Sequence, residues 1–281
     1  PGQDFFQYAN GGYVKALTIP SDRTSYGAFD ALNELSQSRL HVLVEKTAAD
    51  KAAAGDQAKV GALYRSFMAE PQVNALGARP MAADLAAIRA EKTKADVART
   101  MGRSQHTFGG SIFAASVQVD GKDPDHYVVY LNQAGLGLPD RDYYLEAGFA
   151  AQKAKYEAYV AQMLTLAKWP NPAANAKAIV ALETEIARVS WSRAEQRDDN
   201  KMYNAYETAK LAGLAPGFDW QAFMSGAGLT KATRVVAQEN TAFPKIAALF
   251  DKTPLATLKA WQAFNLADQA APYLSKPFAD A

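Results

Sequence analysis

Apolar residues recur at the spacing of an α-helix along most of this 281-residue chain. Two segments show the i, i+3, i+4, i+7 pattern with little interruption: Tyr156, Tyr159, Val160, Met163, Leu164 and Ala167, and then Ile179, Leu182, Ile186 and Val189. A shorter set, Leu32, Leu35 and Leu43, follows the same period between residues 29 and 45. This spacing gathers apolar side chains on one face of each helix, so it predicts a mainly α-helical fold.

One region has a different period. Apolar and polar residues alternate from Phe113 to Val119 and again from Tyr127 to Leu131, and Asp120-Gly121 opens the short segment between them. Alternation with a period of two is typical of half-buried strands, and Asp-Gly is a common turn signal. We therefore expect a multi-helix lobe with one β-hairpin near residues 111–131.

Composition excludes several classes of function. The 30 basic and 29 acidic residues nearly cancel, and without a Lys/Arg run they predict no nucleic-acid partner. No apolar run approaches the roughly 18 residues that a membrane span needs. Cysteine is absent, which excludes thiol nucleophiles and cysteine metal sites but fits both a cytosolic protein and a disulfide-free secreted one.

Several sequence blocks follow one another in a specific order. They are Asp4–Tyr13, Ile19-Pro20 with Tyr26–Leu32, Ala62–Ser66, Leu136–Tyr144 and Asn200–Met202. In order and spacing they resemble the N-terminal portion of the neprilysin and endothelin-converting-enzyme type zinc metallopeptidases. The resemblance covers most of the chain up to Met202, and the remainder matches only in being helical.

The resemblance implies a two-lobed, mainly helical peptidase that encloses a central cavity. Its zinc is held by His-Glu-x-x-His on a helix and by a downstream glutamate, with the first glutamate as general base. This sequence lacks that motif, and its three histidines, His41, His106 and His126, have no ligand spacing. We expect no catalytic residue and no metal ligand in this chain, zinc bound by the missing C-terminal half, and no activity of the chain alone.

His41 and Glu45 lie one helical turn apart. A zinc pair can be imagined there, but tight zinc sites need three or four ligands. We interpret the two residues as a polar pair on a solvated helix face.

The resemblance also implies a substrate-binding segment. Relatives typically carry an arginine directly before Tyr-Gly that binds the C-terminal carboxylate of short peptides; here that position is Ser25, and Arg23 is either its substitute or a surface arginine. Phe29 and Asp30 match positions that line the primed-side subsites, although Phe29 also fits a core anchor of the first long helix. Asn33 stands where relatives carry another arginine. The uncharged Ser25 and Asn33 predict a weak preference for free carboxylates, and hence endopeptidase cleavage.

We expect residues 1–27 to form an extended segment that packs on the absent catalytic lobe, with Phe5, Phe6 and Tyr8 at the contact. Residues 28–281 are expected to form the helical lobe; Tyr273–Phe278 carries no helix stop, which leaves open whether the lobe is incomplete at its C-terminal end. In the Leu136–Tyr144 block, Asp140–Asp142 are interpreted as capping and ion-pairing residues, and Tyr143 and Tyr144 as packed rings with their hydroxyls at the surface.

The leading hypothesis is the N-terminal part of a zinc metalloendopeptidase that cleaves oligopeptides on the amino side of hydrophobic residues. Its partners would be oligopeptides and the C-terminal catalytic portion of the same protein. Its location would be periplasmic or extracellular, with a membrane anchor in a missing N-terminal segment as an open alternative. The competing interpretations are a non-catalytic helical peptide-binding module that has lost the peptidase half, and a structural helical protein without a peptide site.

Overall fold

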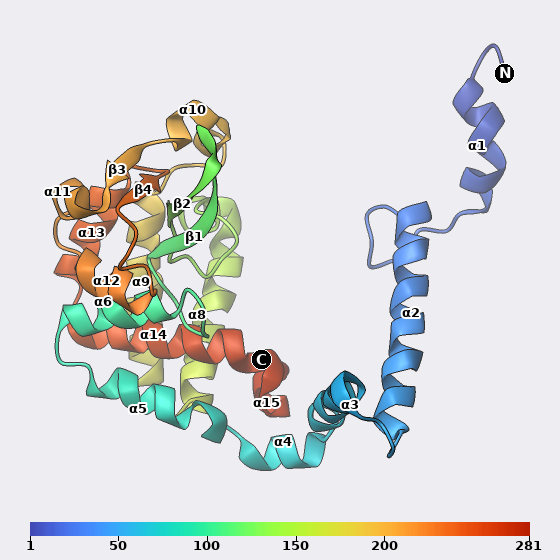
Figure 1. Ribbon diagram of the computed structural model, residues 1–281, viewed down its shortest axis with the longest axis horizontal. Coiled ribbons are helices and arrows are strands. Elements are labelled where there is room, and N and C mark those ends of the chain that lie inside the picture. Colours follow the sequence, from blue (N-terminus) through green and yellow to red (C-terminus); the bar gives the residue numbers. More distant parts are fainter. The chain divides into compact units, whose positions relative to one another are not determined.

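The computed structural model describes all 281 residues and divides the chain into two compact units, Pro1–Ala69 and Glu70–Ala281. Helices dominate both units and one small sheet lies in the second (Figure 1). The expectation of a mainly α-helical fold with a β-hairpin is confirmed. No helix is both long and apolar enough to cross a membrane.

The first unit holds three helices: α1 (Phe5–Ala16), α2 (Ala28–Ala49) and α3 (Gly55–Phe67). Residues 1–27 are therefore not extended throughout as expected, because α1 occupies nearly half of them. Asp4 begins this helix by accepting a hydrogen bond from the Gln7 N–H at 2.8 Å, as an N-cap does. The unit boundary after Ala69 also differs from the expected division after residue 27, since α2 packs against α3.

The second unit holds the remaining helices and all four strands. The helices are α4 (Glu70–Leu76), α5 (Ala82–Ala90), α6 (Lys94–Arg103), α7 (Asp142–Leu145), α8 (Ala150–Leu166), α9 (Pro172–Val189), α10 (Asp199–Met202), α11 (Leu211–Leu214), α12 (Trp220–Gly226), α13 (Phe243–Lys252), α14 (Leu255–Ala270) and α15 (Lys276–Ala279). The apolar faces of α8 and α9 found from the sequence meet each other and α14 in the core.

The sheet has the strand order β1-β2-β4-β3. The predicted hairpin is β1 (Phe113–Asp120) with β2 (Asp123–Gln133), paired antiparallel so that Val117 lies opposite Val129. Two strands were not predicted: β4 (Arg234–Ala237), parallel to β2, and β3 (Ala205–Glu207), antiparallel to β4. The hairpin tip lies beside α10, where the Tyr203 hydroxyl donates to Asp120 at 2.7 Å (Figure 1).

An aromatic cluster joins the start of β1 to α12 and α13. The ring of Phe113 lies 5.0 Å from Phe218, 4.7 Å from Trp220 and 4.8 Å from Phe243, measured between centroids. All four side chains are buried. Packed aromatic rings of this kind dominate core energetics, so the cluster fixes the hairpin on the helices.

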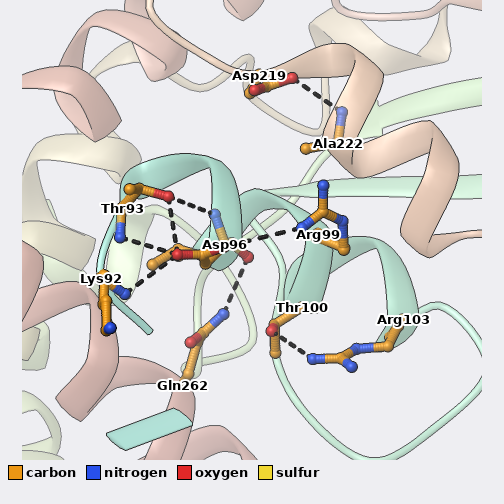
Figure 2. Close-up of polar contacts among 10 residues, drawn as sticks. Lys92, Thr93, Asp96, Arg99, Thr100, Arg103, Asp219, Ala222 and Gln262 are labelled. Carbon is orange, nitrogen blue, oxygen red and sulfur yellow. Dashed lines mark hydrogen bonds and ion pairs between the residues drawn. The ribbon is translucent and has the colours of Figure 1, made fainter. Parts of the chain in front are cut away.

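The N-terminus of α6 is held by polar contacts (Figure 2). The Asp96 N–H donates to the Thr93 hydroxyl at 3.1 Å, and the Asp96 carboxylate in return accepts the Thr93 N–H at 3.0 Å, which forms a capping box. From α14, the Gln262 side chain donates to the Val97 carbonyl at 3.1 Å. The Gln262 bond ties α6 to α14. The Thr93 hydroxyl also donates to the Asp96 carboxylate at 2.8 Å, and this bond is the main cause that lowers the pKa of Asp96.

Candidate functional site

The segment predicted to contact substrate surrounds the start of α2. The helix begins after Gly27, whose N–H donates to the Asp30 carboxylate at 2.7 Å. Asp30 is half-buried, and its carboxylate caps the N-terminus of α2. This bond satisfies one of the backbone donors that a helix N-terminus leaves free, so Asp30 has a structural role in this chain.

Arg23 lies against this helix start. Its guanidinium is 2.8 Å from Glu34, 3.9 Å from Asp30 and 5.4 Å from the centre of the Tyr26 ring. The Tyr26 hydroxyl donates to Glu34 at 2.7 Å, and this hydrogen bond raises the pKa of Tyr26. A peptide carboxylate would have to compete with Glu34 for Arg23, because a guanidinium already paired with a carboxylate is a weaker anion receptor.

Ser25, Phe29 and Asn33 are all exposed. Phe29 is 89% exposed, so within this chain it is not a core anchor, and that alternative is wrong. The structure thus brings Arg23, Tyr26, Asp30 and Glu34 together in one polar cluster. Ser25, Phe29 and Asn33 remain free to contact something else.

Phe29 belongs to a larger apolar surface. In Pro1–Ala69 only two residues are buried, Gly11 and Gly61, whereas most large apolar side chains are exposed; Val44 and Tyr64 are half-buried. The exposed set is Phe5, Phe6, Tyr8, Tyr13, Val14, Ile19, Phe29, Leu32, Leu35, Leu40, Val42, Leu43, Val60, Leu63, Phe67 and Met68. Exposed apolar surface on this scale marks an interaction site.

No set of side chains in this structure fits a zinc ion. His41 lies 3.3 Å from Glu45 and 3.4 Å from the Tyr64 hydroxyl, and His126 lies 2.8 Å from Asp123. His41 and His126 thus have one carboxylate neighbour each, His106 has none, and no group of three or more candidate ligands occurs. Since zinc needs three or four ligands, these residues do not form a zinc site.

A buried carboxylate that the sequence reasoning missed lies between three helices of the second unit. Glu183 on α9 is fully buried and accepts hydrogen bonds from the Tyr144 hydroxyl at 2.7 Å, the Trp261 indole N–H at 2.9 Å and the Tyr156 hydroxyl at 3.2 Å. The Tyr144 hydroxyl also accepts the N–H groups of Gly137 and Leu138 at 3.0 and 2.9 Å. This network holds the Leu136–Tyr144 block against the core.

Burial controls the electrostatics of this network. Loss of hydration raises the pKa of Glu183 to about 7, against the opposing effect of the three hydrogen bonds. Burial and the neighbouring Glu183 raise the pKa of Tyr144 as well. The prediction that the Tyr144 hydroxyl lies at the surface is therefore wrong, whereas Tyr143 is only half-buried and stacks on Phe149 with 4.3 Å between centroids.

Of Asp140–Asp142, interpreted as capping and ion-pairing residues, Asp140 makes such contacts. The Arg141 Nε has no hydrogen-bond partner. Asp140 is ion-paired with Arg193, which also donates to the Pro139 carbonyl at 2.9 Å. Asp140 further accepts the Asp142 N–H at 3.0 Å, next to the start of α7. These contacts hold the loop in place, and Asp140 and Arg193 together line a shallow hollow beside Trp191.

The sequence was compared with protein families and with known proteins. The sequence matches the model of peptidase family M13 over residues 1–281. It is 26% identical to endothelin-converting enzyme 1 of Cavia porcellus and 27% identical to endothelin-converting enzyme-like 1 of Rattus norvegicus. Both alignments cover the whole chain but only 39% and 38% of the relative, so the chain spans about two fifths of the length of these proteins.

Solved structures give the same picture. The zinc metalloprotease ZMP1 of Mycobacterium tuberculosis, in complex with an inhibitor, superposes with a TM-score of 0.87 at 30% identity and covers 99% of this chain and 43% of its own. PEPO of Lactobacillus rhamnosis superposes with a TM-score of 0.70 at 18% identity, over 98% of this chain and 44% of its own. The second likeness concerns the fold alone.

Proposed function

The chain belongs to peptidase family M13, and on that basis we propose that it is the N-terminal part of a zinc metalloendopeptidase that cleaves oligopeptides on the amino side of hydrophobic residues. The match of the family model to the whole chain carries this proposal. The residues of this chain do not fit a zinc ion, so the metal and the hydrolytic step are assigned to polypeptide beyond it. The chain by itself is proposed to be inactive.

The role of this chain in the proposed reaction is to bind and orient the peptide. Phe29 offers an exposed ring at the start of α2, beside Ser25 and Asn33. Contact between the Phe29 ring and an apolar side chain of the peptide would remove both side chains from water. Full burial of a large apolar side chain stabilises by about 1.5–3 kcal/mol. This contact would place the hydrophobic residue on the primed side of the scissile bond.

The pairing of Arg23 supports endopeptidase cleavage. Arg23, two residues before Ser25, is paired with Glu34 and Asp30. A terminal carboxylate would therefore gain little from this segment. We expect the complete enzyme to cleave a peptide and its C-terminally amidated form at similar rates.

The exposed apolar surface of Pro1–Ala69 supports the proposed partner. Phe5, Phe6 and Tyr8 on α1 are each more than 60% exposed. We assign the C-terminal catalytic portion of the same protein as the polypeptide that covers them. A periplasmic or extracellular location, free or membrane-anchored, follows from the family and stays part of the proposal.

The test uses the complete protein with zinc and after zinc removal. Zinc-dependent cleavage before phenylalanine is the expected result, and Phe29→Ala should raise KM for that peptide more than for one with alanine at the same position. Ser25→Arg should create a preference for the free acid over the amide, while Ser21→Arg, on the exposed loop before Arg23, serves as the charge-matched control. Absence of cleavage by the zinc-loaded protein would favour the second candidate, a non-catalytic helical peptide-binding module.

A further inference from the structure

The strand β1 lies at the edge of the sheet, and only its first half is covered. The Ala115 N–H donates to the Gln105 side-chain carbonyl at 2.7 Å, and the Gln105 amide donates to the Phe113 carbonyl at 3.3 Å. Gln105 thus occupies the place of a neighbouring strand for these two residues. The backbone groups of Phe113 and Ala115 are therefore satisfied.

The second half of the edge is uncovered. In an antiparallel pair, successive residues direct their N–H and C=O groups alternately towards the partner and away from it. Because Phe113 and Ala115 face away from β2, Val117 and Val119 do so too. No hydrogen bond joins the outward backbone groups of these two valines to any other residue of the chain.

The side chains on the free edge itself are apolar, and charged side chains, among them Lys231 and Arg234, line the hollow beside Val117. Val117 and Val119 are 57% and 49% exposed, and Tyr127, opposite Val119 on β2, is 75% exposed. Proteins protect edge strands with lysine, proline or a bulge, but the bulge here comes only after Val119. Backbone donors and acceptors beside a β-branched surface fit one kind of occupant, an added strand.

We propose that the edge from Val117 to Val119 binds an extended peptide, antiparallel to β1, with apolar residues opposite the two valines. The inference rests on the proposed function for the source of the peptide, an oligopeptide substrate. A second copy of the chain fits less well, since a stable dimer needs about 1,200 Å² or more of buried surface and three residues of free edge supply far less.

The experiment measures peptide binding by fluorescence anisotropy on the 281-residue chain. The probe is a fluorescein-labelled hexapeptide of alternating threonine and valine, together with two forms N-methylated on the valines or on the threonines. In an antiparallel pair, directly opposite residues carry side chains on the same face, so the valine N–H groups should face β1. Methylation of the valines should abolish binding, and methylation of the threonines should leave it unchanged.

Matched protein variants test the same contact from the other side. Val117→Pro removes the outward donor without removing a β1–β2 hydrogen bond, since proline is tolerated on an edge with its nitrogen outward. It should weaken binding roughly tenfold, while Val117→Thr, which keeps the donor, should change it less than about threefold. Equal binding by Val117→Pro, equal binding of the two methylated peptides, or no saturable binding overturns the proposal.

The outcome is separable from that of the proposed function. If peptide binding depends on Val117 but the complete zinc-loaded protein hydrolyses nothing, the proposed binding edge is supported and the proposed peptidase function is wrong. If the complete protein hydrolyses peptides but Val117→Pro does not change peptide binding, the peptidase function is supported and the proposed binding edge is wrong. Should Val117→Pro fail to fold, as judged by circular dichroism, the two methylated peptides on the unaltered chain still decide the question.

Discussion

At the scale of single residues, burial of the Glu183 side chain makes the stability of the fold depend on pH. A folded-state pKa of about 7, against 4.5 for an ordinary glutamate, means that folding favours the protonated form. The stabilisation is therefore complete below pH 4.5 and is lost as the pH rises through 7. Between pH 5 and pH 8 the free energy of unfolding should fall by about 2–3 kcal/mol from this group, at 1.36 kcal/mol per pKa unit.

The variant Glu183→Gln tests this prediction, because an amide resembles the protonated acid and does not titrate. Urea unfolding at pH 5 and pH 8 should show a smaller loss of stability in Glu183→Gln than in the unaltered chain. Glu185→Gln is the control, since Glu185 lies on the same helix but is exposed beside Arg188. An identical pH dependence for the unaltered chain and Glu183→Gln would show that Glu183 does not bind its proton at neutral pH.

The adjacent tyrosines of the Leu136–Tyr144 block offer a matched pair. Tyr144→Phe deletes the hydroxyl that donates to Glu183 and accepts from Gly137 and Leu138, so it leaves buried groups without partners. We expect a loss of about 2–4 kcal/mol in urea unfolding, because each buried unsatisfied group costs about 1–3 kcal/mol. Tyr143→Phe should cost less than about 0.5 kcal/mol, as its hydroxyl makes no hydrogen bond. Similar losses for both variants would contradict the assignment.

The environments of single side chains could be predicted from the sequence in some cases and not in others. Glu183 falls between Ile179 and Ile186 at helical spacing, so a polar residue on a predicted buried face was the available signal. Nothing in the local sequence distinguishes Tyr143 from Tyr144, because their environments are set by α8, α9 and the loop at Gly137. The partners of Arg23 were equally hidden, since Glu34 becomes its neighbour only when α2 forms.

At the scale of elements, helices α6 and α12 approach each other through glycine. A Cβ on Gly226 would overlap the Arg99 carbonyl oxygen, and one on Gly102 would overlap the Phe223 carbonyl oxygen. Both obstacles are backbone atoms, so relief requires the helices to separate. We expect Gly226→Ala to cost at least about 2–3 kcal/mol, in the range of overpacked cores.

The control for this prediction is Gly213→Ala in α11, where a Cβ would meet nothing within 4 Å. Alanine is preferred over glycine in helices, so this variant should be neutral or more stable by up to about 1 kcal/mol. Thermal unfolding followed by circular dichroism measures both variants. Equal midpoints for the two would mean that α6 and α12 are not held at this distance.

The elements also differ in how well periodicity defines them. The faces of α8 and α9 were predicted because each helix is long and buries one side, and the hairpin because both strands alternate. β3 and β4 have three and four residues, too few for a period to show, and they form through pairing with distant β2. α1 was missed because two adjacent glycines, Gly11 and Gly12, lie inside it, and glycine indicates an irregular segment.

At the scale of the whole molecule, the two units differ in what stabilises them. Every buried apolar side chain of the core lies between Met81 and Phe278, so residues 1–69 contribute none. Helices in water gain most of their stability from packing of an apolar face and are marginal without it. The three helices of Pro1–Ala69 should therefore be far less stable than α8, α9 and α14, although α2 has 22 residues and α8 has 17.

Amide hydrogen exchange measured by mass spectrometry tests this difference directly. In the 281-residue chain we expect opening free energies of about 0–2 kcal/mol for amides in α1, α2 and α3, and values near the global stability, about 5 kcal/mol or more, for α8, α9 and α14. In the complete protein the first three helices should become protected, because the proposed catalytic portion would cover Phe5, Phe6, Tyr8 and the exposed apolar residues of α2 and α3 other than Phe29. Strong protection of α2 in the 281-residue chain alone would show that its apolar residues are already covered, and the proposed partner surface would then be wrong.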